Sequence, residues 1–167
     1  MSNQGESATG TRTILTSLDE VRAAALRVAA SATRMLTMYT QDVEPEIYDQ
    51  PSFVEAIKRL ILARSYAKVR VLIADPARTR FEASKFIGVA RRITSHIEVR
   101  HLRADLRNNS TSFLIADERA LLYRLQCTRW DGLVEMNDPL VSRRYLAYFD
   151  DVWQASEPHL ELRQIRM

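Results

Sequence analysis

The stretch "NSTSFLIADERALLYRL", residues 109–125, decides how the chain is interpreted. Small polar residues lead into an apolar run, an acidic turn follows, and a second apolar run comes after it. Short apolar runs bounded by turn-forming residues are typical of buried strands. The stretch therefore predicts a hairpin whose first strand has Phe113 and Ile115 on one face and Leu114 and Ala116 on the other.

Segments typical of strands and of helices alternate before this hairpin. Such alternation predicts parallel strands joined by right-handed crossovers, and the hairpin adds antiparallel pairing. We therefore expect an α/β fold with a mixed, mostly parallel sheet that is flanked by helices on both faces. Besides the hairpin, the expected strands are residues 13–16, 34–40, 68–75 and 96–102. The expected helices are residues 17–32, 50–65, 79–93 and 139–156. We expect residues 128–139 to be irregular.

Two of the expected helices begin with the pattern of a capping box. In this pattern an N-cap serine or threonine is followed three residues later by glutamate, and the two side chains satisfy backbone N–H groups of the first turn. Ser17 precedes Glu20 at this spacing, and Ser52 precedes Glu55. We expect each serine to cap its helix.

Length and composition predict one domain. Hydrophobic residues make up 46% and charged residues 27%, as in ordinary globular proteins. We expect a flexible N-terminal segment at 1–11 and a single α/β domain at 12–167. No apolar run is long enough to span a bilayer, no secretory signal opens the chain, and Cys127 is the only cysteine. These features predict a cytoplasmic protein without an internal disulfide.

Arginine dominates the basic residues. The chain has 24 Lys and Arg against 21 Asp and Glu, and only three of the 24 are lysine. Arginine suits phosphate and carboxylate recognition because its planar fork donates paired hydrogen bonds. Acidic residues offset most of this charge, and a nucleic-acid footprint needs arginines gathered on one face. Nucleic acid is therefore a partner that the composition leaves open.

Polar side chains occur where the expected parallel strands end. Ligands of open α/β sheets usually bind outside these carboxyl ends. The candidate ligand-edge residues are Thr40, Asp75, His101, Arg103 and Asn109. The alternative is that they share no function, since polar residues are usual wherever strands end and loops begin.

Common catalytic and metal-binding patterns are missing. The chain has no G-x-S-x-G elbow, no P-loop and no G-x-G-x-x-G. His96 and His101 are five residues apart on one expected strand, which puts them on opposite faces. We therefore expect no metal and no cofactor. Trp130 lies in the polar loop "TRWDG", and we expect it to cover the ligand edge or to lie in a subunit interface.

The order of elements resembles one half of the phospholipase D superfamily. The strand "SFLIAD", the returning strand "ALLYRL" and the closing helix "YLAYFDDVW" carry this resemblance. It implies a phospholipase D-like half with the signature H-x-K-x4-D, in which histidine attacks phosphorus, lysine holds phosphate oxygens and aspartate supports a histidine. Alignment on Asp117 puts Ser112 at the lysine and Ser110 at the histidine. The chain is thus similar to single-unit bacterial members with a degenerate motif.

The resemblance implies a non-catalytic binding or scaffold module, a pseudoenzyme, because the motif has lost its nucleophile and its cation. It also implies a homodimer that brings the two motif strands face to face. Ser110 and Ser112 share a strand face, so we expect their hydroxyls to be available to a phosphate-bearing ligand. Two alternatives stay open: a phosphodiesterase or other hydrolase that pairs His101 with Asp117 or Asp75, and a nucleic-acid-binding protein that does not cleave.

Overall fold

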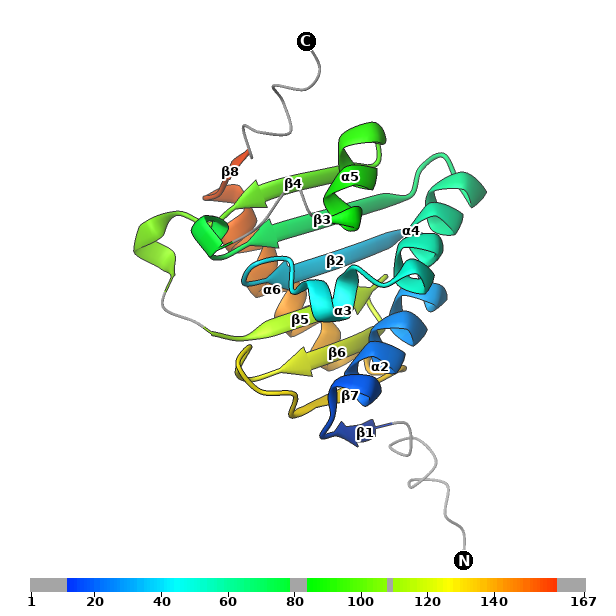
Figure 1. Cartoon of the computed structure of the whole chain (residues 1–167), viewed down its shortest axis with the longest axis vertical. Coiled ribbons are helices and arrows are strands. Elements are labelled where there is room, and N and C mark those ends of the chain that lie inside the picture. Colours follow the sequence, from blue (N-terminus) through cyan, green and yellow to red (C-terminus); the bar gives the residue numbers. More distant parts are fainter. Residues whose placement is uncertain (1–11, 79–83, 108–109, 159–167) are drawn as a thin grey trace, which may run out of the picture.

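One mixed sheet forms the centre of the molecule (Figure 1). The computed structural model describes residues 12–78, 84–107 and 110–158. The eight strands of the sheet are β1 (Arg12–Leu15), β2 (Met35–Thr40), β3 (Lys68–Ile73), β4 (Ile97–His101), β5 (Ser112–Ala116), β6 (Ala120–Arg124), β7 (Gly132–Glu135) and β8 (Glu157–Pro158).

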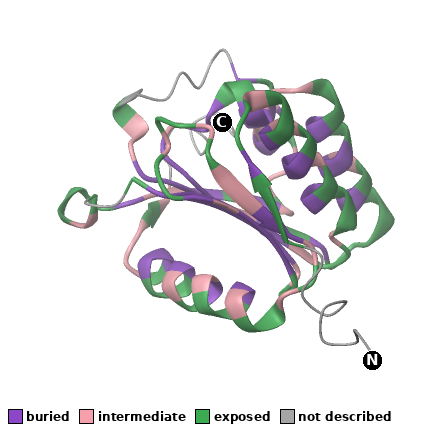
Figure 2. Cartoon of the chain, turned by 90° about the horizontal axis from the view of Figure 1, so that it is seen from below, coloured by how far each residue is buried: buried purple, intermediate pink, exposed green. Residues whose placement is uncertain are grey.

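Helices cover both faces of this sheet, as the sequence predicts. Figure 2 shows α6 alone against one face and the other main helices against the opposite face. None of the helices in the described residues is both long and apolar enough to cross a membrane. The helices are α2 (Leu18–Ser31), α3 (Pro45–Tyr48), α4 (Pro51–Ala63), α5 (Lys85–Arg92) and α6 (Pro139–Gln154), with short 3-10 turns at η1 (Pro76–Arg78) and η3 (Ala104–Leu106).

The strand order is β1-β7-β6-β5-β2-β3-β4-β8. Only β2 with β3 and β3 with β4 are parallel, and the other five neighbouring pairs are antiparallel. The prediction of a mixed sheet is confirmed, but the prediction that it is mostly parallel is wrong. The reason is that β1 does not lie beside β2. It pairs with β7 at the far edge, and the hairpin strand β5 takes the antiparallel place next to β2.

The hairpin lies at the centre of the sheet. All five residues of β5 are buried, and β5 pairs with β2 on one side and β6 on the other. Its side chains alternate as expected: Phe113 and Ile115 join the core under α6, whereas Leu114 and Ala116 join the larger core under α2, α4 and α5. Burial on both faces explains why this stretch is an unbroken apolar run.

One predicted capping box is present and the other is not. The Ser17 hydroxyl accepts a hydrogen bond from the Glu20 N–H at 3.2 Å, and the Glu20 carboxylate accepts from the Thr16 N–H at 2.8 Å. Helix α4 begins at Pro51, with Gln50 as its N-cap and no capping side chain. The prediction that Ser52 caps α4 is therefore wrong. Proline at the first helical position has no N–H to satisfy, and its fixed φ starts the helix.

The predicted third helix is shorter than expected. It begins at Lys85, and the Ser84 hydroxyl caps it by accepting from the Ile87 N–H at 3.1 Å. The segment 79–83 lies outside the described residues.

Strand β7 lies within the stretch that the sequence predicts to be irregular. Its first residue, Gly132, sits so close to β6 that an added Cβ would lie 2.7 Å from the Tyr123 carbonyl oxygen and 2.8 Å from Arg124 Cγ. A side chain here would push against the strand that carries Arg124. Because glycine has no Cβ, it allows β6 and β7 to approach closely at this position.

Replacement of Gly132 by alanine should lower the free energy of unfolding by about 1–3 kcal/mol, because the new methyl group has no space. Gly88→Ala is the matched control, since an added Cβ at this helical position meets nothing within 4 Å. That control should leave stability unchanged or raise it by up to about 1 kcal/mol. Urea unfolding measures both. Equal effects of the two substitutions would contradict the packing argument.

Candidate functional site

Ser112, which the resemblance places at the lysine position of the motif, lies at the edge of the sheet where β2, β3 and β4 end. Thr40 pairs in register with Ile73, and Ile73 pairs with His101, so these strand ends form one row. Strand β5 begins at this same edge, where Ser112 lies opposite Arg124 at the end of β6. We call this row, from Arg124 and Ser112 through Thr40 to His101, the motif edge.

A buried carboxylate organises the motif edge. Glu44 Oε2 accepts hydrogen bonds from the hydroxyls of Thr40 and Ser112, both at 2.7 Å. Glu44 Oε1 accepts from Arg124 Nη1 at 2.6 Å, and only 7% of the Glu44 side chain and 1% of the Arg124 side chain are exposed. Thr40 comes from β2, Ser112 from β5 and Arg124 from β6. The carboxylate therefore joins three adjacent strands beneath the surface.

The guanidinium of Arg124 is committed on its other sides as well. Its Nη2 donates to the backbone oxygens of Cys127 at 2.8 Å and Arg129 at 2.7 Å, and its Nε donates to the Arg129 oxygen at 3.1 Å. The Trp130 ring lies 5.0 Å from the guanidinium carbon. Trp130 thus packs on Arg124 and helps to fix the loop that follows β6.

An unusual backbone conformation brings Glu44 into this position. Val43 has φ = 70° and Glu44 has φ = 36°, both in the left-handed region that L-residues rarely adopt. Such conformations cost about 1–3 kcal/mol each and persist only where the surroundings hold them. Here the three side-chain hydrogen bonds hold the Glu44 carboxylate, and the Glu44 carbonyl accepts from the N–H groups of Ile47 and Tyr48 in α3.

The Ser112 hydroxyl is therefore engaged with a carboxylate inside the chain. Anion binding by Ser112 would require this hydrogen bond to break and would bring the anion toward the negative Glu44. Ser110 is exposed, and its backbone oxygen accepts from the Cys127 N–H at 2.8 Å. Of the two serines that the sequence places on one strand face, Ser110 is exposed and Ser112 is buried.

Asp117 lies at the opposite end of β5, roughly 16 Å along the strand from Ser112 at about 3.3 Å per residue. Its carboxylate accepts hydrogen bonds from the backbone N–H groups of Thr33, Arg34 and Met35 at 2.8–3.2 Å. These bonds attach the β5–β6 turn to the start of β2. Asp117 thus stabilises the hairpin, and its position at the other edge separates it from His101.

The other predicted ligand-edge residues are near the motif edge but outside the Glu44 cluster. His101 Nε2 lies 3.2 Å from Glu157 Oε2 in β8. Asp75 follows β3, and its backbone N–H donates to the Gln41 oxygen at 2.7 Å. Arg103 donates to Asp105 at 2.7 and 3.1 Å and thereby lowers the pKa of the Asp105 carboxyl. Asn109 lies outside the described residues.

Tyrosines near the motif edge stay protonated at neutral pH. Burial raises the pKa of Tyr48, and the negative charge of Glu44 raises it further. Burial likewise raises the pKa of Tyr39, as does its contact with Tyr148, and burial raises the pKa of Tyr123 to about 12. A phenolate nucleophile is therefore disfavoured at these positions.

The sequence does not reveal Glu44 as a central residue. It lies in the loop "DVEPE" and is 80 residues from Arg124 and 68 from Ser112. The only signal is an acidic residue just before Pro45, which is ordinary for a loop. In the described ranges, no group of three or more His, Cys, Asp or Glu side chains could hold a metal ion.

A family model for a domain of unknown function, DUF7931, matches residues 17–165. The chain belongs to the DUF7931 family. No curated protein sequence matches this DUF7931 chain significantly.

Solved structures with the same fold include phospholipase D relatives. TrmBL2, an archaeal chromatin protein whose structure shows a novel mode of DNA binding, has a TM-score of 0.67 at 16% identity and covers 95% of this chain, which spans 57% of TrmBL2. NucT from Helicobacter pylori has a TM-score of 0.65 at 13% identity, with 89% of this chain and 98% of NucT covered. Nuc from Salmonella typhimurium, a phospholipase D family member, has a TM-score of 0.59 at 14% identity, with 89% and 98% covered. The DUF7931 chain therefore has a phospholipase D-like fold.

Arg124→Met should lower the free energy of unfolding by about 3–5 kcal/mol, because it leaves the Glu44 carboxylate buried without its cation. Arg103→Met is the control, since the ion pair of Arg103 with Asp105 is exposed and contributes at most about 1 kcal/mol. Chemical denaturation of the two variants and the wild type measures the difference. A loss as small for Arg124 as for Arg103 would show that the buried pair does not hold the motif edge.

Proposed function

We propose that this DUF7931 chain is a non-catalytic phospholipase D-like domain that acts as a binding or scaffold module. The hydrogen bonding of Glu44 carries this proposal. The resemblance places the phosphate-holding lysine at Ser112, and the Ser112 hydroxyl donates to Glu44. Arg124 is the cation next to it, and its guanidinium is bound by Glu44 and by backbone oxygens. Neither residue is available to stabilise a pentavalent phosphorus.

The nucleophile of the superfamily also has no replacement in the motif itself. Ser110 stands at that position, and it becomes nucleophilic only with an adjacent general base. His101, the imidazole at the motif edge, pairs instead with Glu157. A phosphate-bearing ligand that reached the motif edge would thus not be cleaved.

A hydrolase with a relocated centre is the second candidate function. The pair of His101 and Glu157 favours it, because a carboxylate that orients an imidazole is the arrangement of a general base. Asp117, one of the two partners expected for His101, lies at the opposite edge of the sheet and accepts a hydrogen bond from the Arg34 N–H.

Release of nitrophenolate from bis(p-nitrophenyl) phosphate separates the two candidates. We expect the wild type, Ser110→Ala and His101→Ala all to give the rate of buffer alone, because the motif edge supplies no nucleophile. A wild-type rate above buffer would contradict the non-catalytic proposal. If His101→Ala then abolished it, the relocated centre would be the function.

We further propose that the domain is a homodimer whose motif edges face each other. The side chain of Leu125, the residue after Arg124, supports this arrangement because it is 63% exposed at the motif edge. Contact of this side chain with its copy across a two-fold axis would remove apolar surface from water.

Light scattering should give a mass near twice 19.2 kDa for the wild type and near 19.2 kDa for Leu125→Glu. A charge buried in a two-fold interface meets its own copy, which should dissociate the dimer. Leu62→Glu is the control, since Leu62 is 84% exposed on α4, far along the sheet from the motif edge. A monomeric wild type would rule the dimer out, and dissociation by the control alone would move the interface to α4.

A further inference from the structure

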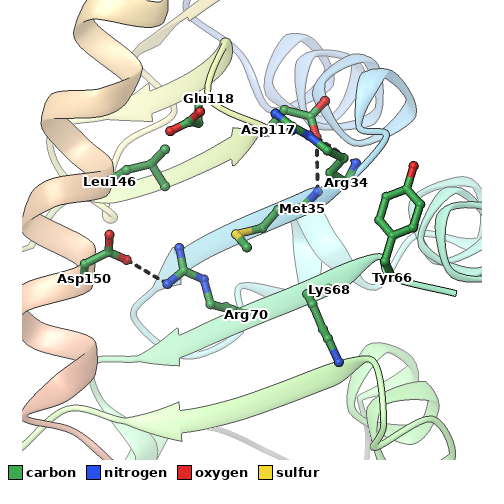
Figure 3. A pocket seen from close by; sticks show the side chains of 9 residues that line it. All are labelled: Arg34, Met35, Tyr66, Lys68, Arg70, Asp117, Glu118, Leu146 and Asp150. Carbon is green, nitrogen blue, oxygen red and sulfur yellow. Dashed lines mark hydrogen bonds and ion pairs between the residues drawn. The ribbon is translucent and has the colours of Figure 1, made fainter. Parts of the chain in front are cut away.

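Two adjoining cavities lie at the edge of the sheet opposite the motif edge. One has a volume of about 440 Å³ and opens between the starts of β2 and β3 and helix α6, as Figure 3 shows. The other has a volume of about 620 Å³ and lies between the C-terminal end of α2 and the start of α6. Arg34, Asp117 and Glu118 line both cavities. The two are therefore parts of one continuous depression.

Arginines surround this depression. Arg34, Arg119 and Arg143 line it and are all exposed. Within the part of the chain that the structure describes, none of the three forms an ion pair. We call the depression lined by these three side chains the arginine cleft. Arginines gathered on one face are the footprint of nucleic-acid binding, and composition alone could not show whether they gather in this way.

The cationic side chains of the arginine cleft outnumber its carboxylates, since Lys68 and Arg70 also line the smaller cavity. Asp117 is held by three backbone N–H groups, and Asp150 pairs with Arg70 at 2.7 Å. Glu118 is exposed and carries the remaining carboxylate. Five cationic side chains (Arg34, Lys68, Arg70, Arg119 and Arg143) thus line the cleft with three carboxylates, and this positive balance favours anions.

Apolar and aromatic surface accompanies the charge. Met35 and Leu146 contribute side chains to the smaller cavity, and Tyr66, which is 58% exposed, stands at its rim (Figure 3). Single-stranded nucleic acid is recognised by this combination, because the phosphates bind cations and each base presents a face that stacks on an aromatic ring. A free phosphate or a phospholipid headgroup has no aromatic base that could stack on the tyrosine ring.

We propose that the arginine cleft binds single-stranded nucleic acid. Arg34, Arg119 and Arg143 contact successive phosphates, and Tyr66 stacks on a base at the end of the smaller cavity. This inference rests on the proposed function as a binding module, and it places the ligand at the edge of the sheet that the superfamily motif does not use. TrmBL2 is a chromatin protein with this fold, which agrees with a nucleic-acid ligand but does not locate it.

Fluorescence anisotropy of a labelled deoxythymidine oligonucleotide tests the proposal across a salt series. The triple variant Arg34→Ala, Arg119→Ala, Arg143→Ala should bind about tenfold more weakly or worse, and the slope of log K against log salt should fall by about two. A second triple variant, Arg27→Ala, Arg59→Ala, Arg92→Ala, removes the same charge from exposed positions that line neither cavity. It should retain nearly wild-type affinity.

Two single variants guard against a general loss of structure. Glu118→Gln removes the opposing carboxylate, so it should tighten binding and raise the salt slope slightly. Tyr66→Ala should weaken binding without changing the salt slope, because stacking releases no counterions.

Several outcomes would overturn the inference. These are a wild type that does not bind the oligonucleotide, equal losses in both triple variants, and preferential binding to phosphatidylglycerol vesicles that compete the oligonucleotide away. Cleavage of the oligonucleotide is scored separately on a denaturing gel. Cleavage would refute the non-catalytic function, whereas loss of binding alone would refute only the site.

Discussion

The Glu44 carboxylate is the interaction on which the motif edge depends. It accepts hydrogen bonds from Thr40, Ser112 and Arg124, and through them it connects β2, β5 and β6. A buried ion pair of this kind adds little net stability, since the cost of desolvation offsets its attraction. The pair instead fixes positions. It holds Val43 and Glu44 in their left-handed conformations, and it orients Arg124, whose guanidinium fixes the loop that follows β6.

Under the proposed function, this network explains why the motif edge would not catalyse phosphodiester cleavage. The resemblance to the phospholipase D superfamily implies that an active site would need a nucleophile and a free cation at the start of β5. Here the hydroxyl at the lysine position faces a carboxylate, and the adjacent guanidinium is enclosed by protein acceptors. The hairpin is held by contacts outside the motif edge, namely the pairing of β5 with its neighbours and the hydrogen bonds of Asp117. Asp117 attaches the turn to the start of β2 whether or not the other end of the strand is catalytic.

Much of the fold could be predicted from the sequence, because local patterns determine it. The apolar run of β5 and its alternation gave the hairpin and its two faces, and the Ser17 box gave the start of α2. The pairing of β1 with β7 could not be predicted, because no local pattern in the β1 sequence shows whether it pairs with β7 or with β2, the next strand in the chain. Strand β7 was missed because its close approach to β6 depends on Gly132, which by itself indicates a loop.

The candidate site could be predicted only in part. The sequence places Thr40 and His101 among the expected ligand-edge residues, and the register of the strands brings Ser112 to the same edge. It could not reveal Glu44, because the contacts that give Glu44 its importance join residues far apart in the chain. It also could not show that Ser112 is buried, because the acceptor of its hydroxyl is Glu44, which lies 68 residues away in the chain.

The side-chain NMR signal of Arg124 tests the central claim most directly. If the Glu44 network closes the motif edge, the Nε–H of Arg124 should exchange with water far more slowly than that of exposed Arg103. Inorganic phosphate added to millimolar concentration should leave the Arg124 signal unshifted. Exchange as fast as that of Arg103, together with a shift that saturates with phosphate, would contradict the account, because it would mean that the motif edge opens and still binds an anion.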